Sequence, residues 1–340
     1  MICPKCQQEV PSANRFCEEC GTRMKPEAGA TAQPRTSTQA APAGATADDR
    51  CPCGAGPDQV DSDGFCSVCG LQRQLGQDRR EFVCTSGAAG ISDVGKKHHK
   101  NDDYFCVSVI PGGYVAVLCD GVSNSQHADE ASRLGAETVL AGLTSRVGAT
   151  PEDWALVVTE AIAEANRRVC ALPRVAANVA GALVDPPSST VVAAVVAGRD
   201  LVVGWMGDSR AYWVTAAGIR QLTQDDTDVK EEMVPALHGG QVRRRVTRTL
   251  SKCLGETEDQ ARVTTLALDA AGLVLLCTDG LWNYAADDQA MRALLQRAPA
   301  GNDAFQLAHH LVGFALDKGG RDNITAVCLL VPAPDGPGSR

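Results

Sequence analysis

The stretch that decides the fold is "VLCDGVSNS", residues 117–125, in which an apolar run stops at Asp120-Gly121. The residues before Asp120 have the composition of a buried strand. An aspartate at the end of such a strand is either a turn residue or a functional carboxylate held at the edge of a sheet. The first interpretation is the common one, because Asp-Gly pairs are frequent in turns. The second interpretation requires further carboxylates at other strand ends.

Further aspartates do recur at predicted strand ends. Asp279 closes the apolar run in "LLCTDG", Asp322 stands just before "NITAV", and Asp102 and Asp103 open the strand in "NDDYF". Carboxylates gathered at one rim of a folded domain repel one another unless cations lie among them. Oxygen ligands alone suit hard octahedral ions, so the sequence predicts Mg²⁺ or Mn²⁺ rather than zinc or copper at this rim.

The pattern of elements predicts an α+β domain. Three helical patterns, over about residues 131–143, 154–172 and 307–315, each present one apolar face. Because strands come in runs and helices in pairs, we expect packed antiparallel sheets flanked by helices and no βαβ alternation. The predicted strands lie at about 82–89, 103–110, 113–119, 189–197, 200–206, 210–215, 261–268, 272–278 and 323–331.

Eight of the fifteen cysteines fall in the first 69 residues, in two sets of four. Four thiolates in two facing knuckles suit one tetrahedral zinc, whereas a redox CxxC pair opens a helix after a strand, and no such pattern surrounds these. Both sets resemble zinc ribbons, which are too short to fold on an apolar core and would depend on the metal. The predicted ligands are Cys3, Cys6, Cys17 and Cys20 for the first zinc, and Cys51, Cys53, Cys66 and Cys69, with a shortened CxC knuckle, for the second.

The remaining cysteines are scattered singly among apolar neighbours, and we interpret them as small buried hydrophobic residues. Residues 23–50 are rich in Ala, Pro, Thr and Gly and read as a flexible tether. The predicted organisation is zinc ribbon 1 at 1–22, the tether at 23–50, zinc ribbon 2 at 51–71, a linker at 72–81, the main domain at 82–332 and a disordered tail at 333–340.

Charge and hydropathy exclude several classes of partner. The net charge is −9, and neither the first 80 residues nor the remainder is net positive, which argues against nucleic acid and favours protein contacts for the ribbons. The longest apolar stretches, such as "TVVAAVVAG" from Thr190, are shorter than the roughly 20 residues that span a bilayer. The start "MICP" is not a signal peptide, so we expect a cytoplasmic protein without a membrane partner.

The ordered motifs carry a family resemblance. The series "SDVGKKHHKNDD", "LCDGV", "SSTVVAA", "GDSRAYWV", "LTQDD", "VTRTLSKCLG", "LLCTDGLWN" and "GGRDNITAV" resembles the bacterial metal-dependent protein Ser/Thr phosphatases of the PPM (PP2C) family over about residues 82–332. The resemblance implies a four-layer αββα sandwich with a two-metal centre at one edge of the sheets. It also implies hydrolysis of phosphoserine and phosphothreonine by a water that two Mg²⁺ or Mn²⁺ ions activate, without a covalent intermediate.

The resemblance assigns the metal ligands position by position. Asp120 would bridge both metals, and the carbonyl of Gly121 would bind one of them. Asp279 and Asp322 would complete the other site. These four residues form the predicted metal centre.

Three more aspartates receive roles from the resemblance. Asp102 stands where relatives have Glu or Gln near the second metal, and Asp103 would orient a metal-bound water. Asp185 matches an aspartate at a weaker third metal position, although "VDPPSST" also reads as a turn before a strand. We expect two, or with Asp185 three, Mg²⁺ or Mn²⁺ ions.

Some positions depart from the family pattern. Where many members have a phosphate-binding arginine, this chain has His98 beside Lys97; either could contact substrate phosphate, but without the fixed fork of arginine. After Asp120-Gly121 the chain reads Val-Ser-Asn in place of Met-Gly-Gly, and no leaving-group acid is identified. Ser209 in "GDSRAY" is a rival nucleophile, but without a G-x-S-x-G elbow we expect Asp208 and Arg210 to hold the fold by hydrogen bonds.

Two functional hypotheses follow from the sequence. The first is an active protein Ser/Thr phosphatase whose ribbons recruit a partner or substrate, such as a Ser/Thr kinase or its targets; small molecules or phosphoproteins of a sigma-factor cascade are further substrates to consider. The second is a phosphatase-like scaffold with weak or no activity that acts through its ribbons. The retained aspartates favour the first, and His98 favours the second. The predicted flap from Asp226 contains a basic cluster of Arg243, Arg244, Arg245 and Arg248. This cluster is either a solvated surface or a binding site for acidic or phosphorylated protein segments.

Overall fold

The computed structural model describes residues 68, 79–146, 150–174, 185–234, 243–255, 260–299 and 301–333, with the backbone alone for 151–152, 230–234 and 243–248. The chain divides into two compact units, Met1–Gly76 and Gln77–Arg340. The predicted ribbons, their eight cysteines, the tether and nearly all of the tail lie outside the described residues, apart from Val68 and residue 333. The organisation predicted for these segments therefore stays a prediction.

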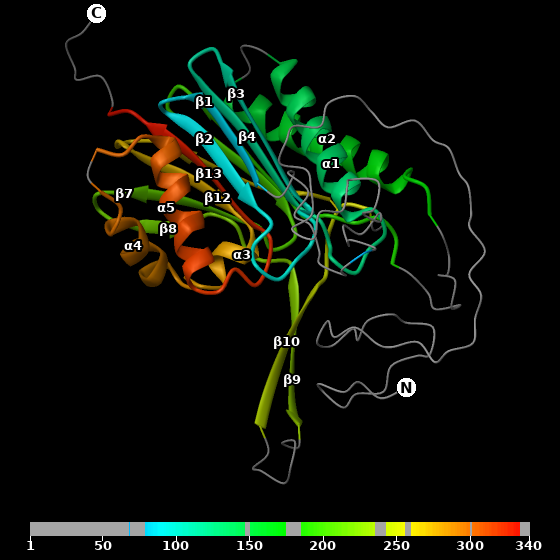
Figure 1. Ribbon diagram of the computed structural model, residues 1–340. Helices are drawn as coiled ribbons and strands as arrows, with labels where there is room; N and C mark the ends of the chain where they lie inside the picture. Colours follow the sequence, from blue (N-terminus) through cyan, green and yellow to red (C-terminus); the bar gives the residue numbers. More distant parts are fainter. Residues whose placement is uncertain are drawn as a thin grey trace, which may run out of the picture. The chain divides into compact units, whose positions relative to one another are not determined.

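Two antiparallel sheets form the centre of the second unit (Figure 1). The six-stranded sheet has the order β1 (Arg79–Thr85), β2 (Ala88–Asp93), β13 (Ile324–Val331), β12 (Gly272–Cys277), β7 (Arg210–Thr215) and β8 (Ile219–Gln221). The five-stranded sheet has the order β11 (Arg262–Ala267), β6 (Asp200–Met206), β5 (Val191–Ala197), β4 (Gly113–Asp120) and β3 (Asp103–Ile110). A separate hairpin pairs β9 (Thr227–Val234) with β10 (Arg243–Leu250).

Helices cover the outer face of each sheet (Figure 1). The five-stranded sheet packs against α1 (Ala128–Thr144) and α2 (Pro151–Cys170). The six-stranded sheet packs against α3 (Asp279–Trp282), α4 (Asp288–Gln296) and α5 (Ala304–Asp317). The described part of the second unit is therefore a four-layer αββα sandwich, the architecture expected from the sequence. None of its helices is long and apolar enough to cross a membrane.

The side chains of β4 show how the layers are held together. Val115, Val117 and Cys119 point to the core under α1 and α2, whereas Ala116 and Leu118 point to the core between the two sheets. This alternation follows from the two-residue period of a strand. Burial of a large apolar side chain contributes about 1.5–3 kcal/mol each, so both faces fix the backbone that ends at Asp120.

The structure refines the predicted elements. Each of the nine predicted strand regions contains a strand, but the region 82–89 holds parts of two strands, because the chain turns at Ser86-Gly87, and the first of them begins at Arg79. The elements β8, β9, β10, α3 and α4 were not predicted. The hairpin segments "TDVKEEMV" and "RRRVTRTL" are rich in charge and lack a regular apolar alternation, and α3 is only four residues long. Among the seven scattered cysteines, which are free thiols, five are buried and two are partly buried.

Candidate active site

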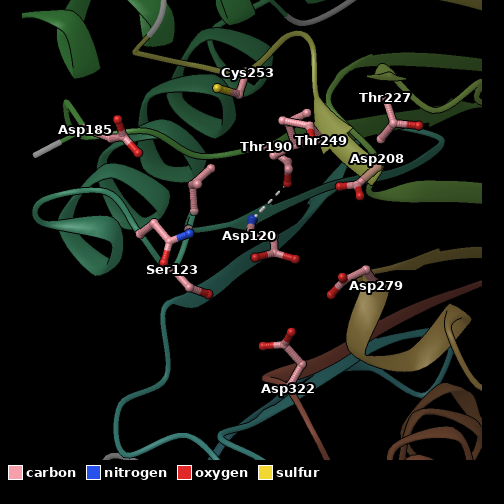
Figure 2. A pocket seen from close by; sticks show the side chains of 14 residues that line it. Asp120, Ser123, Asp185, Thr190, Asp208, Thr227, Thr249, Cys253, Asp279 and Asp322 are labelled. Atoms are coloured by element: carbon pink, nitrogen blue, oxygen red, sulfur yellow. Dashed lines mark hydrogen bonds between the residues drawn. The ribbon is translucent and has the colours of Figure 1, made fainter. Parts of the chain in front are cut away.

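A pocket of about 460 Å³ lies where strands of both sheets end or begin. Figure 2 shows the carboxylates of Asp120, Asp279 and Asp322 turned toward one common space, with Asp208 beside them. Asp120 ends β4 of one sheet, whereas Asp279 follows β12 and Asp322 precedes β13 of the other. The lining residues are Asp120, Gly121, Val122, Ser123, Asn124, Asp185, Thr190, Asp208, Thr227, Thr249, Leu250, Cys253, Asp279 and Asp322.

The main chain of Asp120 is held by the start of β5. Its N–H donates to Thr190 Oγ1 at 3.0 Å, and its carbonyl accepts from Thr190 N at 2.8 Å and from Ser189 Oγ at 2.9 Å. These bonds satisfy the main chain of Asp120 at the strand end, and its carboxylate faces the pocket. The strand end thus aims Asp120 at the centre of the site.

Two glycines permit the close approach of the elements that carry the carboxylates. A Cβ on Gly121 would lie 2.6 Å from the carbonyl oxygen of Ala128, and a Cβ on Gly280 would lie 1.9 Å from that of Asn323. No real side chain tolerates such contacts, so both positions require glycine. The second contact keeps the first turn of α3, with Asp279, against the start of β13, beside Asp322.

The carboxylates raise one another's pKa. Burial, followed by the charges of Asp103 and Asp279, raises the pKa of Asp120 well above its ordinary value. Burial, followed by the charges of Asp322 and Asp208, raises the pKa of Asp279 to about 8. Mutual repulsion of this kind is relieved by a bound cation.

Asp103 faces Asp120 across the β3–β4 pair and is almost fully buried. Its Oδ2 accepts hydrogen bonds from Thr278 Oγ1 at 3.0 Å and from Thr325 Oγ1 at 2.7 Å, whereas its Oδ1 has no partner among the described residues. Burial raises the pKa of Asp103 to about 7, against the lowering effect of the two threonine hydroxyls. It lies behind the pocket and is not part of its lining.

The side chain of Asp102 is also absent from the pocket lining. Its main chain instead links the site: the carbonyl accepts from Gly121 N at 3.1 Å, and the N–H donates to Asn323 Oδ1 at 2.8 Å. Burial raises the pKa of Asp102, while the neighbouring Lys100 lowers it. Asp102 therefore connects the end of β4 to the start of β13.

The two residues predicted to contact phosphate lie apart from the pocket lining. His98 Nε2 is 3.2 Å from Asp322 Oδ1, so His98 contacts a predicted metal ligand. Lys97 is exposed. The structure thus groups Asp120, Gly121, Asp185, Asp279 and Asp322 in one pocket and leaves Asp102, Asp103, His98 and Lys97 around it.

Sequence reasoning missed Asp208 as a pocket carboxylate. Asp208 comes two residues after the end of β6, but serine follows it, so it lacks the Asp-Gly signal of Asp120 and Asp279. The hairpin side of the pocket, with Thr227, Thr249 and Leu250, had no signal beyond its place in the predicted flap. Ser209 is 1% exposed and hydrogen-bonds to Thr190, which agrees with the interpretation that it is not a nucleophile.

The donor atoms of the pocket fit hard divalent cations in type. The pocket lining offers the carboxylates of five aspartates and the main chain at Gly121, and oxygen donors suit Mg²⁺ and Mn²⁺. In the positions shown, no three His, Cys, Asp or Glu side chains of the described residues converge closely enough to hold one ion. The fit therefore rests on donor chemistry and on carboxylate repulsion.

Sequence comparison identifies the class of protein. The family described as protein phosphatase 2C matches residues 93–314, more than half of the chain. The chain therefore belongs to the protein phosphatase 2C family.

Individual relatives agree with this assignment. The serine/threonine protein phosphatase PstP of Mycobacterium tuberculosis is 28% identical over 246 residues, which cover 70% of this chain and 44% of PstP. The chain thus matches less than half the length of that relative. The serine/threonine phosphatase stp of Listeria monocytogenes is 24% identical over 243 residues, 68% of this chain and 90% of stp.

A solved structure shares the fold. The catalytic domain of PstP in complex with two manganese ions superposes with a TM-score of 0.52 at 23% identity. The match covers 74% of this chain and 98% of that domain. This likeness supports the four-layer architecture described above.

Proposed function

We propose that the chain hydrolyses phosphoserine and phosphothreonine monoesters on proteins at the pocket that contains Asp120, Asp279 and Asp322. The observation that carries the proposal is the convergence of carboxylates from both sheets in one pocket, with the pKa of Asp120 and Asp279 raised by burial and mutual repulsion. Such a cluster is costly without cations. Membership of the protein phosphatase 2C family supports the reaction class.

Two Mg²⁺ or Mn²⁺ ions would be held by Asp120, the Gly121 carbonyl, Asp279 and Asp322. The two manganese ions in the PstP catalytic domain support this number. Asp185, on the opposite side of the pocket in Figure 2, would serve a weaker third ion. When bound, such ions make water nucleophilic near neutral pH and neutralise the phosphoryl oxygens.

The chain's own residues would orient and hold the reactants. Asp103 Oδ1, which has no hydrogen-bond partner among the described residues, would accept a hydrogen bond from water in the site. Ser123 and Asn124 on one side and Thr249 on the other supply polar groups for the phosphorylated segment. Asp102 would act near the second ion mainly through its main chain.

The test is phosphate release from a phosphothreonine peptide by the full chain with Mn²⁺. We expect activity in the wild type, none with EDTA, and a loss of at least about a hundredfold in Asp279→Asn, because one ligand charge is removed. The matched control is Asp269→Asn, the same change at an exposed residue outside the pocket, which should behave as wild type. Equal activity in the two variants would refute the assignment of Asp279.

For the first unit we propose two structural zinc ions, one per set of four cysteines, and a role in recruiting a phosphoprotein, a Ser/Thr kinase or its targets. Support comes from the cysteine spacing. Elemental analysis of protein purified without chelators should give about two zinc per chain, and a value near zero would exclude the ribbons. A cytoplasmic location remains our prediction from sequence.

One contact favours the alternative, a scaffold with weak or no activity. Because His98 faces Asp322 at 3.2 Å, it is not placed in the pocket as a phosphate ligand. If His98 nonetheless replaces a phosphate-binding arginine, His98→Arg should lower KM for the peptide severalfold through bidentate contacts. An unchanged KM would remove His98 from substrate binding, and an inert wild type would favour the scaffold.

A further inference from the structure

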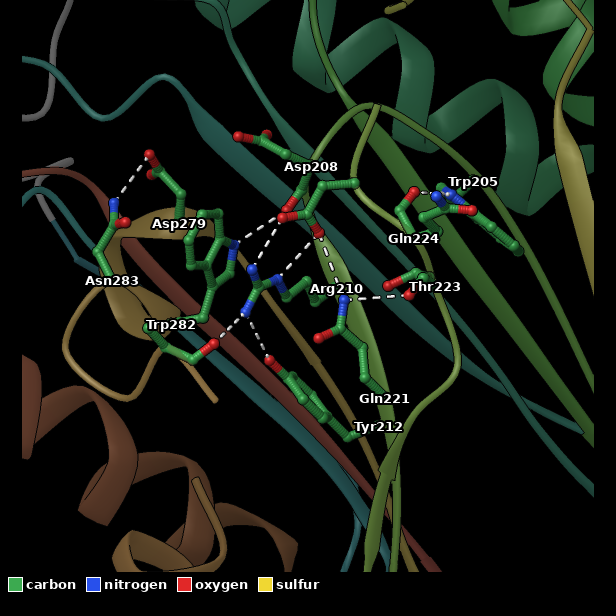
Figure 3. Close-up of polar contacts among 12 residues, drawn as sticks. Trp205, Asp208, Arg210, Tyr212, Gln221, Thr223, Gln224, Asp279, Trp282 and Asn283 are labelled. Carbon is green, nitrogen blue, oxygen red and sulfur yellow. Dashed lines mark hydrogen bonds and ion pairs between the residues drawn. The ribbon is translucent and has the colours of Figure 1, made fainter. Parts of the chain in front are cut away.

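The turn Gly207–Arg210 crosses from β6 in the five-stranded sheet to β7 in the six-stranded sheet. It is therefore a direct covalent link between the two layers that supply the pocket carboxylates. Figure 3 shows its surroundings, where Asp208, Arg210 and Trp282 lie together. Each of its four residues makes a contact that connects the turn to a pocket carboxylate, to Trp282 or to the base of the hairpin.

Trp282 joins Asp208 to the helix that carries Asp279. Its indole Nε1–H donates to the carbonyl oxygen of Asp208 at 2.9 Å, and the side chain is 1% exposed. Trp282 is the last residue of α3, and Asp279 is the first. Since α3 is a single turn, the position of the indole and the position of the Asp279 carboxylate are tied together.

Arg210 fixes Trp282 from one face. Its guanidinium carbon lies 3.7 Å from the centroid of the Trp282 ring, a cation–π contact in a nearly buried place. The guanidinium is bidentate to Asp225, with Nε and Nη2 at 2.9 and 2.8 Å from the two carboxylate oxygens. Nη1 donates to Tyr212 OH at 3.2 Å and to Ala286 O at 2.9 Å. The planar fork is thus held on every edge, which a lysine could not reproduce.

The other two residues of the turn reach the third carboxylate and the hairpin base. A hydrogen bond of 2.8 Å joins Ser209 Oγ to Thr190 Oγ1, the same atom that accepts the Asp120 N–H. Gly207, at φ +105°, donates its N–H to Asp226 Oδ2 at 3.2 Å and accepts the Asp226 N–H at 3.0 Å. The turn is therefore anchored at both ends.

We infer that the turn Gly207–Arg210 is the positioning unit that sets Asp208, Asp279 and Asp120 relative to one another across the two sheets, with the Trp282–Asp208 bond as its central link. Arg210 and Trp282 lie behind the pocket and are absent from its lining, so they act through the carboxylates and do not touch substrate. The inference rests on the proposed metal-dependent function, because metal affinity is the property that such positioning controls.

The test compares Trp282→Phe with the wild-type full chain. Phenylalanine keeps an aromatic face for Arg210 and loses the donor to Asp208. We expect Mn²⁺ binding by calorimetry to weaken about three- to tenfold, the effect of one net hydrogen bond. The Mn²⁺ concentration for half-maximal peptide hydrolysis should rise by the same factor, and by more than kcat falls. Arg210→Lys, which loses the fork and the stacking surface, should show a larger effect.

The control is Trp154→Phe, which removes a 3% exposed indole from α2, in the other outer layer and outside the pocket lining. It should lower the Tm without changing Mn²⁺ affinity. If Trp282→Phe and Arg210→Lys both bind Mn²⁺ as tightly as the wild type, the positioning unit is wrong while the proposed function stands. If the wild type itself binds no Mn²⁺, both fail.

Discussion

The two sides of the pocket are built differently. The carboxylate side is formed by ends of strands that are hydrogen-bonded within the two sheets and buried on both faces. Another part of the lining, the hairpin side, is formed by Thr227, Thr249 and Leu250 at the base of the β9–β10 hairpin, which is a separate two-stranded sheet. We expect the carboxylate side to carry the proposed chemistry and the hairpin side to contact the bound peptide segment.

The largest expected effect is on the carboxylate side. Asp120→Asn should lower peptide hydrolysis at least about a hundredfold, because the residue predicted to bridge both ions loses its charge. The same variant should not lower the Tm of the chelator-treated protein, since it removes a buried carboxylate that repels Asp103 and Asp279. Phosphate release from the peptide and thermal melts of the chelator-treated protein measure the two effects; a clear destabilisation of the metal-free variant would contradict the repulsion argument.

A smaller but still large effect concerns the close approach of α3 and β13. Gly280→Ala should destabilise the domain by about 1–3 kcal/mol, because the added Cβ cannot fit 1.9 Å from Asn323 O. Gly313→Ala, in the interior of α5 with open space around it, is the matched control and should be neutral or stabilising. Urea denaturation of both variants provides the measurement, and equal stabilities would speak against the tight junction.

The effect of pH should be moderate. Folding raises the pKa of Asp279 from about 4 to about 8. Between these two pH values the unfolded chain has lost the proton that the folded chain still holds, so the metal-free fold loses stability as pH rises through this range. Protons also compete with the ions, so Mn²⁺ should bind more tightly as pH rises over this range. The increase in Tm on addition of Mn²⁺ should be several degrees larger at about pH 8 than at about pH 6. A larger increase at the lower pH would reverse the assigned sign.

The smallest effect belongs to the hairpin side. Thr249→Ala should change KM for phosphopeptides by about two- to fivefold, the scale of one exposed polar contact, and should leave Mn²⁺ affinity unaltered. Steady-state kinetics on two peptides of different sequence would reveal whether the change depends on the peptide. A loss of metal affinity in this variant would remove the distinction between the two sides.

The same contrast explains what the sequence could predict. Val115 to Cys119 are apolar on both faces, so the strand that ends at Asp120 has a strong signal, and the Asp-Gly pairs mark Asp120 and Asp279. The sequence did not identify Asp208 as a pocket residue, because the residue after it is serine and because it lies where the chain crosses between the two sheets. Such a crossing is a tertiary feature without a local pattern.

Local sequence patterns could not predict the β9–β10 hairpin or the position of His98 for a similar reason. The charged segments of β9 and β10 pair with each other and have no apolar face that would reveal a strand. His98 was aligned with a phosphate-binding position, but the fold brings its ring to Asp322, a residue more than two hundred positions away. Only the three-dimensional arrangement shows that contact.

The central claim is that oxygen-ligated ions in the carboxylate pocket drive phosphomonoester hydrolysis. The most direct measurement is phosphate release from a phosphothreonine peptide as Mn²⁺ is titrated into chelator-treated full chain, in the wild type and in Asp279→Asn. We predict that activity returns with Mn²⁺ in the wild type and stays at least about a hundredfold lower in the variant. Hydrolysis that persists in EDTA, or a wild type that stays inert at saturating Mn²⁺, would contradict the account.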